Sequence, residues 1–148
     1  MKKFVRADPL LLAVVLITAV IVLFQIGRPA DAQTPAPCLH VPLAVVVDLN
    51  NDRQAPVIDH ARDAVRDGQP RILHIDREDA DAHRAASLRG TPVRSGFDRD
   101  EYPPAASQEG GAGADVRYIS PRANASAGAT MGNQLRGFCN GQSFIIEP

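Results

Sequence analysis

Positive charge is scarce in most of this 148-residue chain. Its only two lysines are Lys2 and Lys3, and the formal net charge is −1. Without residues 1–32 the chain keeps twelve arginines against fifteen acidic residues, which is a net charge of −3. Non-specific affinity for nucleic acid comes chiefly from neutralising phosphates. The composition therefore argues against binding by bulk positive charge, although clustered arginines and a divalent cation could supply it locally.

Charged residues are absent from the stretch between Pro9 and Ile26. Lys2 and Lys3 precede this apolar stretch and the small-x-small run Ala30-Asp31-Ala32 follows it, which is the pattern of a secretory signal peptide. The same stretch approaches the roughly 20 residues of a membrane-spanning helix. We predict a signal peptide over residues 1–32, with an uncleaved membrane anchor as the alternative. Either way we expect the rest of the chain outside the cytoplasm, secreted or anchored to the outer face of the cell membrane.

Cysteine is equally scarce, since Cys38 and Cys139 are the only two. Structural zinc normally takes four nitrogen or sulfur ligands, and His40 is the only histidine close to either cysteine. A zinc site is therefore disfavoured. A pair of cysteines in an oxidising compartment typically forms a disulfide. We expect one disulfide, Cys38–Cys139.

A short Pro/Ala-rich stretch predicts a linker over residues 33–40, and we expect one domain, over 41–148, to follow it. Short runs of β-branched residues predict strands, and apolar residues at helical spacing predict helices. We expect strands over 43–48, 71–75, 116–119 and 143–147, and helices over 57–65, 79–89 and 128–135. A polar turn over 50–56 and a charged loop after residue 96 complete the order. This arrangement predicts an α+β domain with a small, mainly antiparallel sheet.

The stretch from Phe97 to Leu135 concentrates charge among glycines and prolines. It contains the runs DRDEYPPA (98–105), EGGAGADVRYISP (109–121) and AGATMGNQL (127–135). Solvated charge normally repeats along a helix face, whereas these acids lie beside residues that set unusual backbone angles. Carboxylates in such loops usually hold a cation or transfer protons. We therefore predict that this stretch forms the functional site.

Most polar side chains of this stretch carry oxygen, the ligand atom that Mg²⁺ and Mn²⁺ prefer. The carboxylates are those of Asp98, Asp100, Glu101 and Glu109, and the amides are those of Asn133 and Gln134. Arg99 or Arg117 could bind a phosphate oxygen through two N–H groups. Phosphodiester cleavage requires a divalent cation and a base that deprotonates water. The stretch contains every group that this reaction needs.

The three runs resemble those of the NucA/NucB family of secreted bacterial deoxyribonucleases. Weaker similarity upstream, at 75–77 and 85–90, extends the resemblance over roughly residues 41–148. It implies a secreted, metal-dependent and sequence-nonspecific endodeoxyribonuclease with DNA as its substrate and Mg²⁺ or Mn²⁺ as its cofactor. We expect a monomer without a stable membrane partner if the signal is cleaved. The sequence identifies no inhibitor protein.

In outline the site also resembles the ββα-metal nucleases, where a base enters from a strand and an asparagine on the following helix helps hold one metal. Their base is usually the histidine of an Asp-Arg-Gly-His type motif. The corresponding run 98–101 is Asp-Arg-Asp-Glu, so a carboxylate replaces that histidine. We expect the base to be Asp100 or Glu101, with Asp100 preferred. The other assignments are Arg99 beside the base, Glu109, Asn133 and Asp98 at the metal, and Arg117 and Gln134 at the substrate phosphate.

Two other functions fit the same residues. One is a cation-binding extracellular interaction module, whose acidic loop binds calcium purely for structure. The other is a catalytically inactive nuclease-like domain. His74 and His83 are not assigned to catalysis, because nothing around either of them supplies a catalytic triad. We interpret both as packed or surface histidines.

Overall fold

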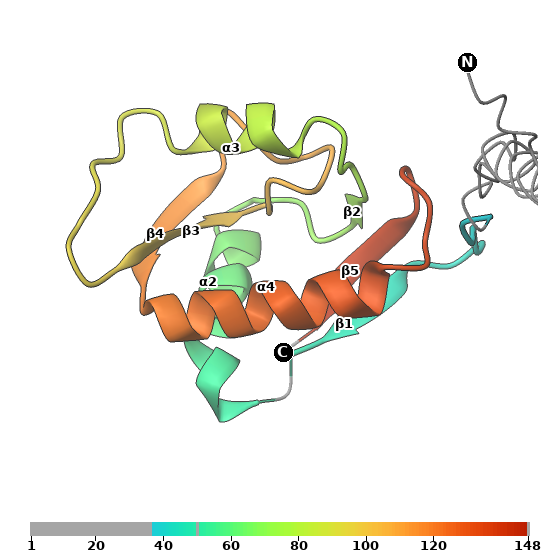
Figure 1. The fold of residues 1–148 in the computed structure, drawn as a ribbon, viewed down its shortest axis with the longest axis horizontal. Coiled ribbons are helices and arrows are strands. Elements are labelled where there is room, and N and C mark those ends of the chain that lie inside the picture. Colours follow the sequence, from blue (N-terminus) through green and yellow to red (C-terminus); the bar gives the residue numbers. More distant parts are fainter. Residues whose placement is uncertain (1–36, 50, 148) are drawn as a thin grey trace, which may run out of the picture. The chain divides into compact units, whose positions relative to one another are not determined.

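The computed structural model of the protein describes residues 37–49 and 51–147. The predicted signal segment and residues 33–36 of the predicted linker lie outside these ranges. Within them, no helix is both long and apolar enough to cross a membrane. Figure 1 shows how the described helices and strands are arranged.

The strands form two small sheets. In the first, β5 (Ser143–Glu147) lies between β1 (Val45–Asp48), to which it is parallel, and β2 (Leu73–His74), to which it is antiparallel. The second is an antiparallel hairpin of β3 (Asp98–Tyr102) and β4 (Asp115–Ile119). Antiparallel pairing therefore predominates in the described part of the chain. The predicted α+β class is confirmed.

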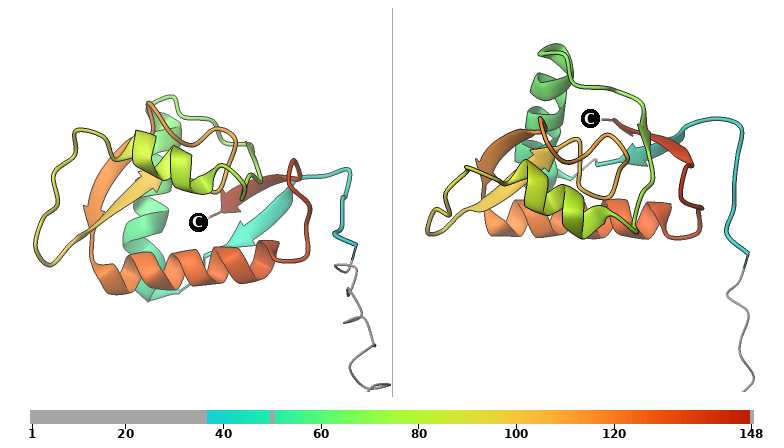
Figure 2. Two further views of the ribbon diagram at one scale, coloured as in Figure 1. Left: turned by 45° about the horizontal axis from the view of Figure 1, so that its top comes forward. Right: turned by 90° about the horizontal axis from the view of Figure 1, so that it is seen from above.

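Three helices accompany these sheets in the described residues. They are α2 (Ala55–Arg66), preceded by the 3₁₀ turn η1 (Asp52–Gln54), α3 (Ala80–Ser87) and α4 (Pro121–Leu135). Both α2 and α4 contact strands of both sheets, and Figure 2 shows α4 running past the two. The core is built from Val47, Leu73 and Phe144 of the first sheet, from Ile75, which follows β2, and from small helix residues such as Ala61 and Ala127. Small residues allow the helices to approach the strands closely.

Helix α4 begins at Pro121, seven residues before the start that the sequence pattern predicted. The Ser120 side chain accepts a hydrogen bond from the Ala123 amide, and Pro121 occupies the first helical turn. A serine N-cap followed by proline is a favourable helix start. The pair Ser120-Pro121 thus ends β4 and also starts α4. Gly128, the predicted start, lies inside the helix.

Residues 98–102 form strand β3, although the sequence pattern predicted a loop there. Every residue of β3 is charged except Tyr102, and none is β-branched. The strand forms because it pairs along its whole length with β4, from Asp98 opposite Ile119 to Tyr102 opposite Asp115. A cis peptide bond joins Tyr102 to Pro103 at its end.

The predicted disulfide between Cys38 and Cys139 is present, with a Cα–Cα distance of 5.0 Å. Backbone hydrogen bonds flank it, since the Leu39 amide donates to the Gly137 carbonyl and the Cys139 amide donates to the Leu39 carbonyl. The fully buried Gln142 continues this link by bonding the backbone of Val41 and Leu43. The segment before β1 is therefore held against the segment before β5.

Candidate active site

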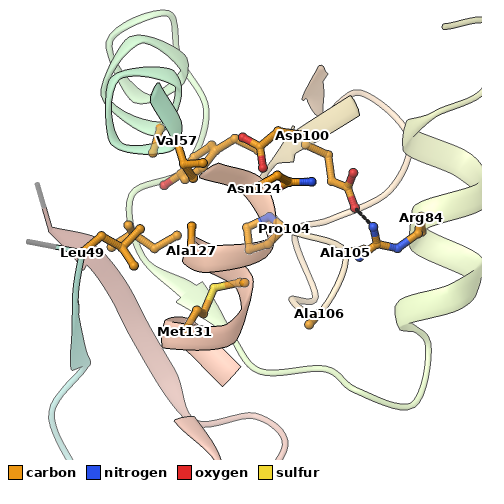
Figure 3. A pocket seen from close by; sticks show the side chains of 15 residues that line it. Leu49, Val57, Arg84, Asp100, Pro104, Ala105, Ala106, Asn124, Ala127 and Met131 are labelled. Carbon is orange, nitrogen blue, oxygen red and sulfur yellow. Dashed lines mark ion pairs between the residues drawn. The ribbon is translucent and has the colours of Figure 1, made fainter. Parts of the chain in front are cut away.

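A pocket of about 110 Å³ lies among α2, α4, strand β3 and residues 104–106 (Figure 3). Much of its wall is apolar and comes from residues such as Val57, Ala61, Ala127 and Met131. Four polar side chains share this lining: Arg84, Asp100, Glu101 and Asn124. An apolar wall with a few converging polar groups is the usual composition of a ligand or substrate site.

Glu101 is the most unusual of these polar residues. It is only 7% exposed, and its Oε1 lies 3.2 Å from Nη1 of Arg84. The other oxygen, Oε2, is buried and has no hydrogen-bond partner among the described residues. Burial raises the pKa of Glu101, although the positive charge of Arg84 opposes the rise. A buried carboxylate oxygen without a partner costs stability, and such groups are concentrated at functional sites.

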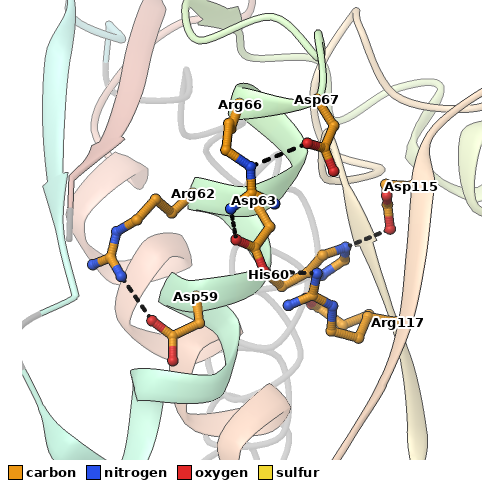
Figure 4. A network of polar contacts seen from close by, with 9 residues as sticks. Asp59, His60, Arg62, Asp63, Arg66, Asp67, Asp115 and Arg117 are labelled. Atoms are coloured by element: carbon orange, nitrogen blue, oxygen red, sulfur yellow. Dashed lines mark hydrogen bonds and ion pairs between the residues drawn. The ribbon is translucent and has the colours of Figure 1, made fainter.

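Asp100 precedes Glu101 in β3, and successive strand residues point to opposite faces. Its Oδ2 lies 2.6 Å from Nδ1 of His60, a residue of α2 that is completely buried. Nε2 of the same histidine lies 3.0 Å from Oδ1 of Asp115 on β4. Figure 4 shows this ring between α2 and the hairpin. One oxygen of Asp100 is therefore engaged, while its side chain still lines the pocket.

Sequence reasoning missed His60. A signal for it exists, because His60 follows Val57 by three residues and precedes Ala64 by four, which places it on the apolar stripe of the predicted helix. A polar residue on such a stripe is buried and needs a partner. The partner itself could not be read from the sequence, because it lies 40 residues away on β3.

The two asparagines near the ends of α4 lie in different surroundings. Asn124 lines the pocket, and its Nδ2 donates to Oδ2 of Asp98 at 3.2 Å. Asn133, which the sequence assigned to the metal, is exposed and accepts a hydrogen bond from Arg136 at 2.6 Å. The structure thus brings Asn124, and not Asn133, to the acidic strand. The late predicted start of the helix is the reason that Asn124 was overlooked.

Glu109 lies outside the lining of this pocket and holds a turn. It accepts hydrogen bonds from the His74 amide at 2.9 Å and from His74 Nδ1 at 2.7 Å. Burial alone would raise the pKa of Glu109, but the hydrogen bonds from His74 outweigh it and lower that pKa. His83 contacts the Ala105 carbonyl at 3.2 Å. Both histidines thus take part in contacts that hold segments beside the pocket.

Three further side chains that the sequence assigned to the site, those of Arg99, Arg117 and Gln134, make contacts within the fold. Arg99 donates to the Thr91 carbonyl, and Arg117 pairs with Asp63 at 3.1 Å. Gln134 bonds both the amide and the carbonyl of Asp48, at the end of β1. Arg84 is the arginine that lines the pocket, and its side chain is 56% exposed. Arg84 is therefore the best placed of these groups to meet a substrate phosphate.

Comparison with known proteins identifies the family of this chain. A model of the deoxyribonuclease NucA/NucB family matches residues 61–147. The chain belongs to the NucA/NucB family. The match contains the β3–β4 hairpin, α4 and all four polar residues of the pocket, and it begins one residue after His60. The resemblance of the runs in residues 98–135 is thereby confirmed.

The "DNA-entry nuclease" of Bacillus subtilis (strain 168) is a relative of this NucA/NucB chain. The two are 41% identical over 96 residues, which make up 65% of this chain and 65% of the relative. The similarity therefore spans less than two thirds of the length of that nuclease. A match over this part does not by itself assign the activity of the whole relative to this chain.

The pocket of this NucA/NucB member offers oxygen atoms to a metal ion. In residues 37–49 and 51–147, no three histidine, cysteine, aspartate or glutamate side chains form a group that could hold one. The pocket does offer carboxylate oxygens of Asp100 and Glu101 and the amide oxygen of Asn124. A small oxygen set suits Mg²⁺ or Mn²⁺, because Mg²⁺ keeps several of its waters. The pocket lining contains neither cysteine nor histidine, so its donor atoms are oxygens, and this chemistry favours the fit.

Proposed function

We propose that this domain is a metal-dependent endodeoxyribonuclease that hydrolyses DNA phosphodiester bonds with little sequence preference. The observation that carries the proposal is the buried, unpartnered Oε2 of Glu101 in a pocket shared with Arg84, Asp100 and Asn124. Family membership supports the reaction class, since the family is one of deoxyribonucleases. DNA is the proposed substrate.

In this proposal Glu101 is the general base. Its free Oε2 takes a proton from the attacking water, while a bond forms between the water oxygen and phosphorus and the bond to the leaving ester oxygen breaks. A raised pKa brings the carboxylate closer to the operating pH and so makes it a stronger base. Glu101 replaces Asp100, the base that we preferred from the sequence, because Oδ2 of Asp100 is already engaged by His60.

The remaining pocket groups bind and orient the substrate. Arg84 contacts Glu101 through Nη1, so other N–H groups of its guanidinium are free to bind a non-bridging phosphate oxygen. Asp100 and Asn124 offer oxygens that would hold Mg²⁺ or Mn²⁺. The cation, when bound, neutralises charge that develops on the phosphate and on the leaving oxygen. This local positive charge compensates for the acidic balance of the chain.

We also propose that the domain works outside the cytoplasm as a monomer, either secreted or anchored to the outer face of the membrane. The disulfide between Cys38 and Cys139 supports an oxidising compartment. Residues 1–32, the proposed signal segment, would direct the chain out of the cytoplasm.

The test is cleavage of supercoiled plasmid by the purified protein in Mg²⁺, in Mn²⁺ and in excess EDTA. We expect nicking and linearisation with either cation, none with EDTA, and a severe loss in Glu101→Gln. Asp59→Asn, on an exposed part of α2, is the matched control and should cut normally. A thermal shift with cation but no cleavage would instead indicate the interaction module. If the protein shows neither a thermal shift nor cleavage, the domain is inactive.

A further inference from the structure

A completely buried histidine joins three elements beside the pocket. His60 of α2 contacts Asp100 of β3 through Nδ1 at 2.6 Å and Asp115 of β4 through Nε2 at 3.0 Å. The two carboxylates approach the ring from neighbouring strands of one hairpin. Each ring nitrogen thus faces a carboxylate oxygen, and an ionised carboxylate only accepts hydrogen bonds.

The surroundings of the histidine separate it from the other charged groups of the hairpin. Arg117 lies directly opposite Asp100 in the strand register, yet its guanidinium pairs with Asp63 at 3.1 Å. Figure 4 shows Arg117 and Asp63 beside the histidine. Among the described residues, His60 is thus the hydrogen-bond and ion-pair partner of the Asp100 carboxylate. The Asp100 side chain is only 14% exposed, so water contributes little to its orientation.

Holding one oxygen of Asp100 determines where the other lies. Oδ2 faces His60 on the α2 side, while the side chain lines the pocket together with Glu101 and Asn124. Among the described residues, no hydrogen bond or ion pair engages the remaining oxygen, Oδ1. A group that orients a cation ligand typically changes metal affinity or activity by about 10- to 100-fold when it is lost.

We infer that His60 is a positioning residue that fixes Asp100 so that Oδ1 faces the pocket, and that Asp115 in turn fixes the ring of His60. The inference rests on the proposed function. It assigns a role in the site to a residue just before the part of the chain that the family model matches.

Two substitutions of His60 separate positioning from simple packing. In His60→Asn the amide nitrogen can replace Nδ1 and donate to Asp100, whereas in His60→Gln it can replace Nε2 and donate to Asp115. We expect His60→Gln to lower kcat by about 10- to 100-fold with an unchanged KM for DNA. His60→Asn should stay near the wild-type kcat. Equal kcat values in the two variants would overturn the inference.

Mn²⁺ affinity, measured by electron paramagnetic resonance on the full chain without DNA, gives a readout that does not depend on cleavage. We expect weaker Mn²⁺ binding in His60→Gln than in His60→Asn. Absence of cleavage by the wild-type protein would refute the proposed function alone, because this order of affinities would still test the positioning role. The same affinity in both variants would refute the positioning role alone.

Asp115→Ala provides the test if both His60 variants fail to fold. The Asp115 side chain is 41% exposed, so its loss leaves a small cavity at most. We expect a lower kcat and weaker Mn²⁺ binding, because the ring loses its second anchor. Asp63→Ala is the control, since it breaks the neighbouring pair with Arg117 without touching His60 or Asp100. Identical behaviour of the two alanine variants would overturn the inference.

Discussion

Arg84 and Glu101 meet in the lining of the pocket, and the arginine engages only one oxygen of the carboxylate. Nη1 of Arg84 lies 3.2 Å from Oε1, while the buried Oε2 accepts no hydrogen bond from the described residues. The pair therefore joins a group that can bind phosphate to a group that can accept a proton. This one-sided contact underlies the first two predictions.

The first prediction separates the two candidate bases. Glu101→Gln keeps the size of the side chain and removes its basicity, so turnover should fall by about 10²- to 10⁴-fold at any Mg²⁺ concentration. Asp100→Asn should lose part of its activity and recover some of it at higher Mg²⁺, because it weakens a cation ligand. Plasmid cleavage across a Mg²⁺ titration measures both. Near-normal turnover in Glu101→Gln together with an inactive Asp100→Asn would return the base to Asp100.

The second prediction concerns stability and pH. The pKa of Glu101 in the folded protein is raised above its ordinary value of 4.5, mainly by burial. Between these two pKa values the folded protein holds a proton that the unfolded chain has released, so stability falls as the pH rises through this window. Glu101→Gln removes this pH-dependent loss of stability. Its melting temperature should exceed that of the wild type at neutral pH, and the difference should shrink below pH 4.5.

The ion pair with Arg84 does not reverse this expectation. The Arg84 side chain is 56% exposed, so water solvates its guanidinium when the carboxylate is removed. A melting temperature of Glu101→Gln that stays below the wild type at every pH would contradict the prediction. Calorimetry at several pH values measures the melting temperatures of both proteins.

The third prediction compares the two asparagines of α4. Asn124→Ala should raise the Mg²⁺ concentration for half-maximal cleavage, because Asn124 lines the pocket. Asn133→Ala is the matched control on the same helix, since its side chain is exposed and bonds Arg136. It should leave the Mg²⁺ dependence unchanged. A shift confined to Asn133→Ala would restore the assignment made from the sequence.

The fourth prediction concerns the disulfide, whose cysteines are 101 residues apart. Chain-entropy arguments give a loop of this length about 4 to 5 kcal/mol of stabilisation, as an upper figure. The double variant Cys38→Ser, Cys139→Ser should therefore unfold at lower denaturant concentration but still cut DNA when folded. Chemical denaturation measures the first effect and cleavage the second. Unchanged stability would show that the bond does not constrain the unfolded chain.

The fifth prediction concerns Gly110, in the loop beside the pocket. A Cβ atom at this position would lie 2.7 Å from the Pro104 carbonyl oxygen, which is closer than real contacts allow. Gly110→Ala should therefore cost about 1 to 3 kcal/mol, since backbone must move. Gly132→Ala, inside α4 with nothing within 4 Å, should stabilise by about 0.5 to 1 kcal/mol. Equal melting temperatures for the two variants would contradict the close approach.

The acidic run and the disulfide could be predicted because both are local or countable features. The run from Asp98 to Glu101 contains the two candidate bases within four residues, and two cysteines allow one pairing. The pattern could not decide between Asp100 and Glu101. That choice depends on which oxygen is engaged, and the partners, His60 and Arg84, come from different helices.

The partners of the arginines were equally inaccessible to sequence reasoning. Arg99 and Arg117 lie in the site stretch, yet one donates to the Thr91 carbonyl and the other pairs with Asp63 on α2. Arg84 comes from α3, which lies outside the stretch that the sequence pattern assigned to the site. An arginine reaches a partner through a long side chain, so its neighbours in sequence say little about its neighbours in space.

The parallel pairing of β1 with β5 has a consequence for the order in which the protein is made. Val45 pairs with Phe144, and Cys38 bonds to Cys139, so the first sheet requires residues synthesised about a hundred positions apart. Contacts of such long range form late, after the costly loop between them has closed. The sheet that supports α2 and α4 therefore cannot be completed on a chain that has emerged only in part. Ile146 of β5 lines the pocket, so the pocket is complete only after β5 has been synthesised.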